Sequence, residues 1–177
     1  MKKTFVLLAC LLALVIGAAA QEDLNFASLP LLSTPSSMPN GYGSLNWTNI
    51  FYVDPYLWSG SGPGYKDGLT GEDVAFIGSK VCRVLQEACY GTIGSNGGPS
   101  SFQAVSATVA GGFGPTSITV TAYNNGNYVG SAFYSLGTSM QTLTFPASWG
   151  SITQLTFQTA AGGDLVFYDV KVYLLGG

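Results

Sequence analysis

The chain of 177 residues contains no histidine. This absence excludes catalytic triads built on histidine, histidine-ligated zinc and copper sites that use imidazole. Charged residues are also scarce, at 8% of the chain, and only six residues are lysine or arginine. Because so few cations cannot form a basic patch, the composition argues against nucleic acid and anionic membranes as partners.

Long hydrophobic runs are absent except at the N-terminus. Residues 1–20 combine Lys2 and Lys3 with a short apolar run and the small residues Ala18–Ala20, which is typical of a signal peptide cleaved before Gln21. The run is shorter than the ~20 apolar residues that span a bilayer. The sequence therefore predicts a secreted, extracellular protein without a membrane span.

Cysteine is limited to three residues, of which Cys10 would be discarded with the signal peptide. Cys82 and Cys89 remain in an oxidising compartment, so a disulfide between them is the default expectation. A metal site on two cysteines would need further ligands, and histidine is not there to supply them.

After the signal peptide, residues 21–40 form a lead-in rich in proline and serine. Several apolar side chains in it, such as Leu24 and Phe26, are unusual for a free linker. Part of the segment is therefore expected to pair at the edge of a sheet, where proline is tolerated. Residues 41–177 suit a single domain.

Alternating apolar residues predict one continuous strand over Leu45–Val53 and a short buried strand within Gly71–Gly78. Val81–Tyr90 has helical spacing, but its glycine neighbours favour a loop or a short turn. Gly91–Ser100 is rich in Gly, Asn and Pro, which predicts another loop.

The dipeptide Asn125-Gly126 is the strongest hairpin signal in the chain and favours a type I′ turn. A two-residue loop pairs Tyr123 with Tyr128 on one face and sets Ala122 opposite Val129. The same register predicts a core face that holds Ile118, Val120, Ala122, Val129 and Phe133.

The C-terminal strand, Asp164–Leu174, is expected to place Val166, Tyr168, Val170, Val172 and Leu174 on one face, with Asp169 and Lys171 on the other. Short strands at regular spacing with turns between them indicate an all-β protein, either an antiparallel β-sandwich or a barrel.

Two blocks carry a family resemblance: Gly41–Phe51 reads GYGSLNWTNIF, and Gly64–Phe76 reads GYKDGLTGEDVAF. They resemble blocks of secreted fungal and bacterial β-sandwich proteins, Gly-Tyr-Gly-Gly-Leu-x-Trp-x-Asn-Phe and Gly-Tyr-x-x-Gly followed by Val-Ala-Phe. The resemblance implies a jelly roll of the galactose-binding or carbohydrate-binding-module kind. It covers the chain from Gly41 to the end.

Jelly rolls of this kind often hold a structural calcium ion with an aspartate of the last strand. The resemblance therefore marks Asp169 as the candidate metal ligand. In the related pattern the acid lies one position earlier, where this chain has Tyr168.

Loop aromatics are the main candidates for binding: Tyr56, Trp58, Tyr65, Tyr90 and Trp149. Aromatic rings stack on the C–H faces of sugars, and nearby Asp54, Asp67 or Asn96 could supply the polar contacts of such a site. The alternative is that these rings pin glycine-rich loops onto the ends of the sandwich, since large aromatics are mostly buried.

The resulting prediction is non-enzymatic carbohydrate binding through Tyr56, Trp58, Tyr65, Asp54 and Asp67, with polysaccharides or glycoprotein glycans as partners. A structural or cell-wall protein is the alternative. A hydrolase or lyase is less favoured, because Glu72 and Asp73 are adjacent in a strand and point to opposite faces. Asn46-Trp47-Thr48 is a glycosylation sequon in a eukaryote.

Overall fold

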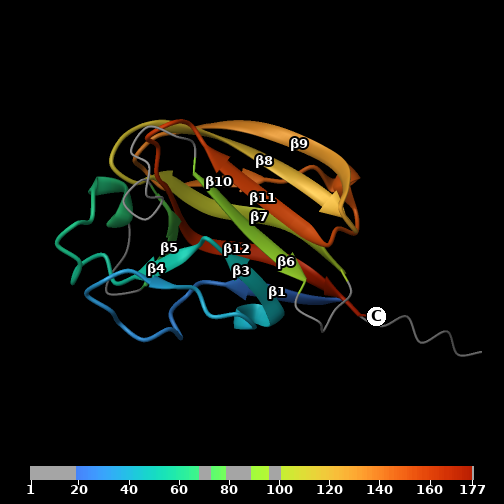
Figure 1. The fold of residues 1–177 in the computed structure, drawn as a ribbon, viewed down its shortest axis with the longest axis horizontal. Coiled ribbons are helices and arrows are strands. Elements are labelled where there is room, and N and C mark those ends of the chain that lie inside the picture. The colour runs from blue at the N-terminus through green and yellow to red at the C-terminus, as the bar shows by residue number, and fades with distance from the viewer. Residues whose placement is uncertain (1–18, 68–72, 79–88, 96–100, 177) are drawn as a thin grey trace, which may run out of the picture.

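The computed structural model describes residues 19–67, 73–78, 89–95 and 101–176. In these ranges the chain forms two antiparallel β-sheets that pack as a β-sandwich of jelly-roll type (Figure 1). Helical structure there is limited to the 3-10 turns Tyr42–Ser44, Pro63–Tyr65 and Ala147–Trp149, so no described helix could cross a membrane. The predicted all-β antiparallel sandwich is confirmed.

The larger sheet has seven strands in the order β10-β7-β12-β5-β4-β2, with β1 also paired to β12. Both short strands of the lead-in join it, so the expected pairing of this segment at a sheet edge is confirmed for β2. The strands are β1 (Ala20–Leu24), β2 (Ser36–Ser37), β4 (Phe51–Val53), β5 (Val74–Ile77), β7 (Ser101–Gly111), β10 (Gln141–Thr144) and β12 (Leu165–Leu175).

The smaller sheet has five strands in the order β3-β6-β11-β8-β9. The strands are β3 (Leu45–Thr48), β6 (Tyr90–Ser95), β8 (Thr116–Asn124), β9 (Asn127–Leu136) and β11 (Gln154–Thr159). The loop predicted over Gly91–Ser100 is wrong for its first half, because β6 pairs with both β3 and β11. Gly91 lies where the sheets approach closely, and a Cβ there would come within 2.3 Å of Ile77 Cδ1.

The single strand predicted over Leu45–Val53 is also wrong. Asn49, at φ 55°, breaks it into β3 in the five-stranded sheet and β4 in the seven-stranded sheet. Asparagine is one of the few residues that adopts this left-handed conformation at low cost. The segment therefore crosses from one layer of the sandwich to the other.

The hairpin of β8 and β9 pairs Tyr123 with Tyr128 as predicted, and their ring centroids lie 6.4 Å apart. A β-bulge follows, so Ala122 pairs with Gly130 instead of Val129. The predicted core positions of Val129 and Phe133 are therefore wrong, and both side chains are exposed. Gly130 lies close to the indole of Trp149: a Cβ there would come within 2.6 Å of Trp149 Nε1, which leaves little room for a larger residue.

Strand β12 contains a second bulge, at Tyr168, where its register with β7 shifts. The prediction that Val166 and Tyr168 share a face with Val170 is wrong, because the bulge reverses the alternation. Phe167 is therefore turned toward the other sheet, whereas Tyr168 is turned outward.

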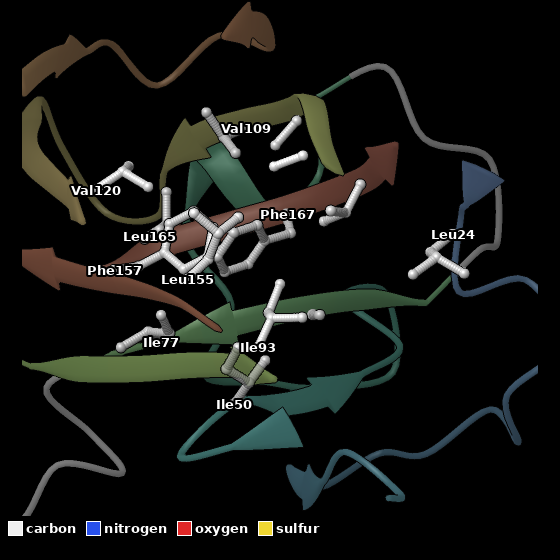
Figure 2. Packing of buried hydrophobic residues seen from close by; sticks show 14 of the residues in the cluster. Leu24, Ile50, Ile77, Ile93, Val109, Val120, Leu155, Phe157, Leu165 and Phe167 are labelled. Atoms are coloured by element: carbon white, nitrogen blue, oxygen red, sulfur yellow. The ribbon is translucent and has the colours of Figure 1, made fainter. Parts of the chain in front are cut away.

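The central core lies between the two sheets (Figure 2). Phe157 of the five-stranded sheet and Phe167 of the seven-stranded sheet meet edge to face there, with ring centroids 5.0 Å apart. A second, smaller cluster lies on the outer side of the seven-stranded sheet and consists of Val53, Tyr65, Val74, Phe76, Ala110, Val166 and Tyr168, with Phe51 and Trp58 packed against it.

Candidate functional site

The loop after β4 carries most of the residues predicted to bind a ligand, and it lies at the left of Figure 1. Its first residue, Asp54, is buried and organises the turn: Oδ1 accepts hydrogen bonds from Tyr56 N at 2.7 Å and Leu57 N at 3.2 Å. Aspartate commonly stabilises turns in this way. This carboxylate oxygen is therefore occupied by the protein's own backbone.

Trp58 and Tyr65 form the cover of the second cluster. Trp58 stacks on Phe76 with ring centroids 5.5 Å apart, and Tyr65 meets Trp58 edge to face at 5.3 Å. Tyr65 is only 1% exposed, and burial, followed by the charge of Asp164, raises the pKa of its phenol. The loop is held down further where Tyr168 Oη donates a hydrogen bond to Gly64 O.

The other two predicted ligand residues in this loop differ in what they offer. Tyr56 is 48% exposed, with Lys66 Nζ 5.9 Å from its ring centroid. Asp67 Oδ2 accepts a hydrogen bond from Met140 N at 2.5 Å. Of the five predicted ligand residues, Tyr56 thus has the most accessible ring, while Asp54, Tyr65 and Asp67 have structural contacts.

The remaining candidates are scattered over the molecule. Trp149 is buried against Phe145, with ring centroids 5.9 Å apart, whereas Tyr90 is exposed on β6. Asn46 Nδ2 donates to Ser95 O at 3.3 Å, a bond that a glycan on this nitrogen would have to replace. Glu72 and Asn96 lie outside the described residues.

The predicted disulfide and the predicted calcium ligand stay predictions. Cys82 lies outside the described residues, and Cys89 is buried, with its N–H donated to Thr159 Oγ1 at 3.1 Å. Asp169 Oδ1 accepts a hydrogen bond from Thr108 N at 3.3 Å. In the described ranges, no three or more Asp, Glu, Cys or His side chains gather as a metal site.

A surface that the sequence reasoning missed lies on the outer side of the five-stranded sheet, which we call the open face. Its side chains point away from the core and remain partly or fully exposed. It consists of Asn46, Thr48, Tyr90, Thr92, Thr119, Thr121, Tyr123, Tyr128, Ser131, Phe133, Gln154, Thr156 and Gln158.

The strand registers arrange these side chains in rows across the sheet. One row runs from Tyr90 through Gln158 and Thr119 to Phe133, so an aromatic ring stands at each end. Three strand spacings separate the two rings, roughly 14 Å. Phe133 is 66% exposed and Tyr90 51%, so both rings are accessible from solvent.

The next row consists of hydroxyl groups, Thr48, Thr92, Thr156, Thr121 and Ser131. Several of these groups interact: Thr92 Oγ1 lies 3.5 Å from Thr156 Oγ1, which also accepts a hydrogen bond from Gln154 Nε2 at 3.1 Å. The paired rings of Tyr123 and Tyr128 lie beyond it. The face therefore alternates aromatic rings with fixed hydroxyl and amide groups.

The open face is hollowed beside Phe133. Two depressions, of about 270 and 480 Å³, share Ser117, Phe133, Ala160 and Ala161. Gln158 and Thr119 line the smaller one, which connects it to the row that ends at Tyr90. The exposed phenyl ring thus forms a wall next to polar groups, a common arrangement in small-molecule sites.

The five strands that build the open face contain no Asp, Glu, Lys or Arg. The seven-stranded sheet carries charges, for example Glu22 and Asp23 on β1, and Lys171 Nζ lies 3.3 Å from Asp23 Oδ2. A surface without charge cannot attract phosphate or carboxylate groups through ion pairs.

Comparison with known proteins shows the fold but no family. By sequence, the chain matches no protein family and no curated protein. Its structure is similar to that of a DUF4465 family protein from Bacteroides caccae, with a TM-score of 0.54 and 9% identity over 93% of this chain and 96% of that one.

Carbohydrate-binding modules are weaker structural neighbours. The family 11 module of the cellulase Lic26A-Cel5E of Clostridium thermocellum matches with a TM-score of 0.45 and 12% identity over 90% of this chain and 96% of the module. TmCBM61, solved with β-1,4-galactotriose, matches with a TM-score of 0.40 and 14% identity over 86% of this chain and 99% of the module. The similarity of both modules to this protein is too low to transfer a ligand.

Proposed function

We propose that this chain is a secreted, non-catalytic carbohydrate-binding protein whose binding surface is the open face. The observation that carries the proposal is the row Tyr90–Gln158–Thr119–Phe133, in which two exposed rings flank an amide and a hydroxyl. Aromatic rings contact the apolar faces of sugars, and a few placed polar groups fix their orientation. Because the five strands of the open face carry no charged side chain, this surface favours neutral sugars over acidic ones.

The binding surface differs from the loop that the sequence suggested. The rings of Trp58 and Tyr65 pack against the second cluster. They therefore expose less ring surface to a ligand than Phe133 and Tyr90 do. Tyr56 remains an accessible ring on that loop. It provides the natural comparison in a binding experiment.

The proposal excludes hydrolysis at this surface. Glycosidases generally need a pair of carboxyl groups about 5–10 Å apart. The strands of the open face contain neither Asp nor Glu, so they offer no carboxyl group as general acid or nucleophile. A neutral polysaccharide incubated with the protein should release no new reducing ends.

Secretion rests on the predicted signal peptide. Expression of the full chain in an exporting host should yield a mature protein whose mass corresponds to a start at Gln21. A protein that stays in the cytoplasm with residues 1–20 attached would contradict this part of the proposal.

The test of the binding surface uses the mature protein and a panel of neutral and acidic polysaccharides. Affinity electrophoresis or calorimetry should detect binding to at least one neutral glycan. Because central aromatic contacts commonly carry more than about 1 kcal/mol, Phe133→Ala and Tyr90→Ala should each weaken binding about fivefold or more. Tyr56→Ala is the matched control and should bind as the wild type does.

Two results would overturn the proposal. Loss of binding in Tyr56→Ala with retention in Phe133→Ala would move the site to the loop after β4. Absence of binding to every glycan, with a correctly folded protein, would favour a structural or cell-wall role.

A further inference from the structure

Two aspartates face each other at the end of the β4–β5 pair. Val53 pairs with Val74 in this antiparallel ladder; Asp54 follows Val53, and Asp73 precedes Val74. Continuing the register by one step puts Asp54 directly opposite Asp73. Side chains in such positions have Cβ atoms about 4.5–5.5 Å apart, and like charges placed there destabilise the pair.

Both aspartates are buried, with exposed fractions of 4% for Asp54 and 1% for Asp73. Asp54 Oδ1 is used by the backbone N–H groups of Tyr56 and Leu57. Among the residues that the structure describes, neither carboxylate oxygen of Asp73 has a hydrogen-bond partner. A buried ionised carboxylate without a partner is strongly unfavourable, so the site must gain a proton or a cation.

The described lysines do not neutralise this pair. Lys171 forms an ion pair with Asp23, and Lys66 is exposed and lies over the ring of Tyr56. Burial, and after it the neighbouring charge of Asp54, raises the pKa of Asp73 to about 6. Both side chains end in a carboxylate, so oxygen atoms are the only functional groups they present.

We propose that Asp54 and Asp73 bind a hard divalent cation of the calcium class. Calcium is held by carboxylate and carbonyl oxygens together with water, and it tolerates irregular geometry. A bound ion would relieve the repulsion across the ladder and satisfy the oxygens of Asp73. This site lies apart from Asp169, which is on β12 and accepts a hydrogen bond from Thr108.

The ion would have a structural effect on the outer side of the seven-stranded sheet, which the loop after β4 covers. Asp54 begins the turn in which Trp58 N donates to Asp54 O at 3.0 Å, and Trp58 packs on Phe76 of β5. Asp73 leads directly into β5. Cation binding would therefore link the start of the loop after β4 to β5, the strand on which this loop packs.

The test compares thermal unfolding of the EDTA-treated mature protein at pH 7.5 with and without millimolar CaCl2. Saturating calcium should raise the Tm of the wild type by about 5 °C or more. Asp73→Asn should show no calcium response, and without metal it should melt above the metal-free wild type because the repulsion is gone. Asp169→Asn is the matched control and should respond as the wild type does.

A second variant and a direct measurement guard against poor folding of Asp73→Asn. Asp54→Asn keeps an Oδ1 acceptor for the turn but removes one charge, so it should fold and bind calcium at least tenfold more weakly by calorimetry. Terbium luminescence excited through nearby aromatic rings should appear in the wild type and be displaced by calcium.

Three outcomes would overturn the proposal. A wild type that does not respond to calcium, together with a stabilised Asp73→Asn, would mean that the two carboxylates share a proton. A calcium response lost in Asp169→Asn but retained in Asp73→Asn would assign the ion to β12. Equal calcium responses in all variants would indicate a different site. The measurement needs no glycan, so its result is independent of the proposed carbohydrate binding.

Discussion

The two outer faces of the sandwich differ in what covers them. On the seven-stranded sheet, Phe76 lies beneath Trp58 and Tyr65, and its ring is fully buried. On the five-stranded sheet, Phe133 of the edge strand β9 also points outward but is 66% exposed. The two phenylalanines thus have different roles: Phe76 holds the loop after β4 in place, and Phe133 is available to a partner.

This comparison explains why the loop aromatics and the sheet aromatics should be distinguished. A ring that buries its faces against the protein contributes to stability and has little area left for a ligand. A large apolar ring left in water contributes little to stability, and a contiguous exposed apolar patch often marks an interaction site. The predictions below follow from this difference.

The largest expected loss of stability is on the outer face of the seven-stranded sheet. Phe76→Ala should lower the free energy of unfolding by about 3–5 kcal/mol, because it removes a buried ring and leaves a cavity under Trp58. Phe133→Ala should change it by less than about 0.5 kcal/mol. Urea denaturation of the two variants measures both values, and similar losses would contradict the assignment of the faces.

The pH dependence of stability should report on Asp73. Its pKa in the folded protein, about 6, lies above the ordinary value of 3.8, so the folded state holds the proton more tightly. In EDTA, the free energy of unfolding should therefore fall as the pH rises from about 4 to above 6. The difference in the free energy of unfolding between the wild type and Asp73→Asn should be constant below pH 4 and should grow up to pH 6. A difference that does not change with pH would refute the assignment.

A smaller loss of stability is expected where the loop after β4 approaches β7. An added Cβ at Gly64 would lie 2.0 Å from Gly111 O, a backbone atom that cannot easily move. Gly64→Ala should destabilise the protein by about 1–3 kcal/mol. The matched control is Gly114→Ala, since no atom lies within 4 Å of the Cβ position there. Equal melting temperatures for the two variants would show that the loop does not pack closely on the sheet.

The sequence predicted the layers and the hairpin turn but not the bulges. Asn125-Gly126 set the first two pairs of β8 and β9 correctly. The extra residue at Val129 then reversed the later side chains, and the indole of Trp149, from a distant segment, lies close to Gly130 beside it. The position of Phe133 on the surface could not be predicted without knowledge of this bulge.

Other errors have similar physical causes. Asn49 could have been recognised as a break, because asparagine often adopts positive φ. The strand Tyr90–Ser95 was not predicted, because its glycines are typical of a loop. Gly91 is required there by its close approach to Ile77. The rows of the open face depend on pairing between strands far apart in sequence, such as β6 and β11.

The smallest effect on stability should come from the hydroxyl row of the open face. Thr121→Val replaces a hydroxyl with a methyl group of similar shape on a strand, so the free energy of unfolding should change by less than about 0.5 kcal/mol. Binding of a neutral glycan should weaken severalfold, because a polar contact to the ligand is lost. Unchanged binding by calorimetry would restrict the site to the aromatic rings.

The most direct test of the central claim maps the ligand onto the two faces. Backbone amide NMR spectra of the mature protein should be recorded during titration with a soluble neutral oligosaccharide that it binds. We expect the largest shift changes in β6, β8, β9 and β11, centred on Gln158, Thr119 and Phe133, with the loop after β4 unaffected. Changes concentrated at Tyr56 and Leu57, with the five-stranded sheet unperturbed, would contradict the account.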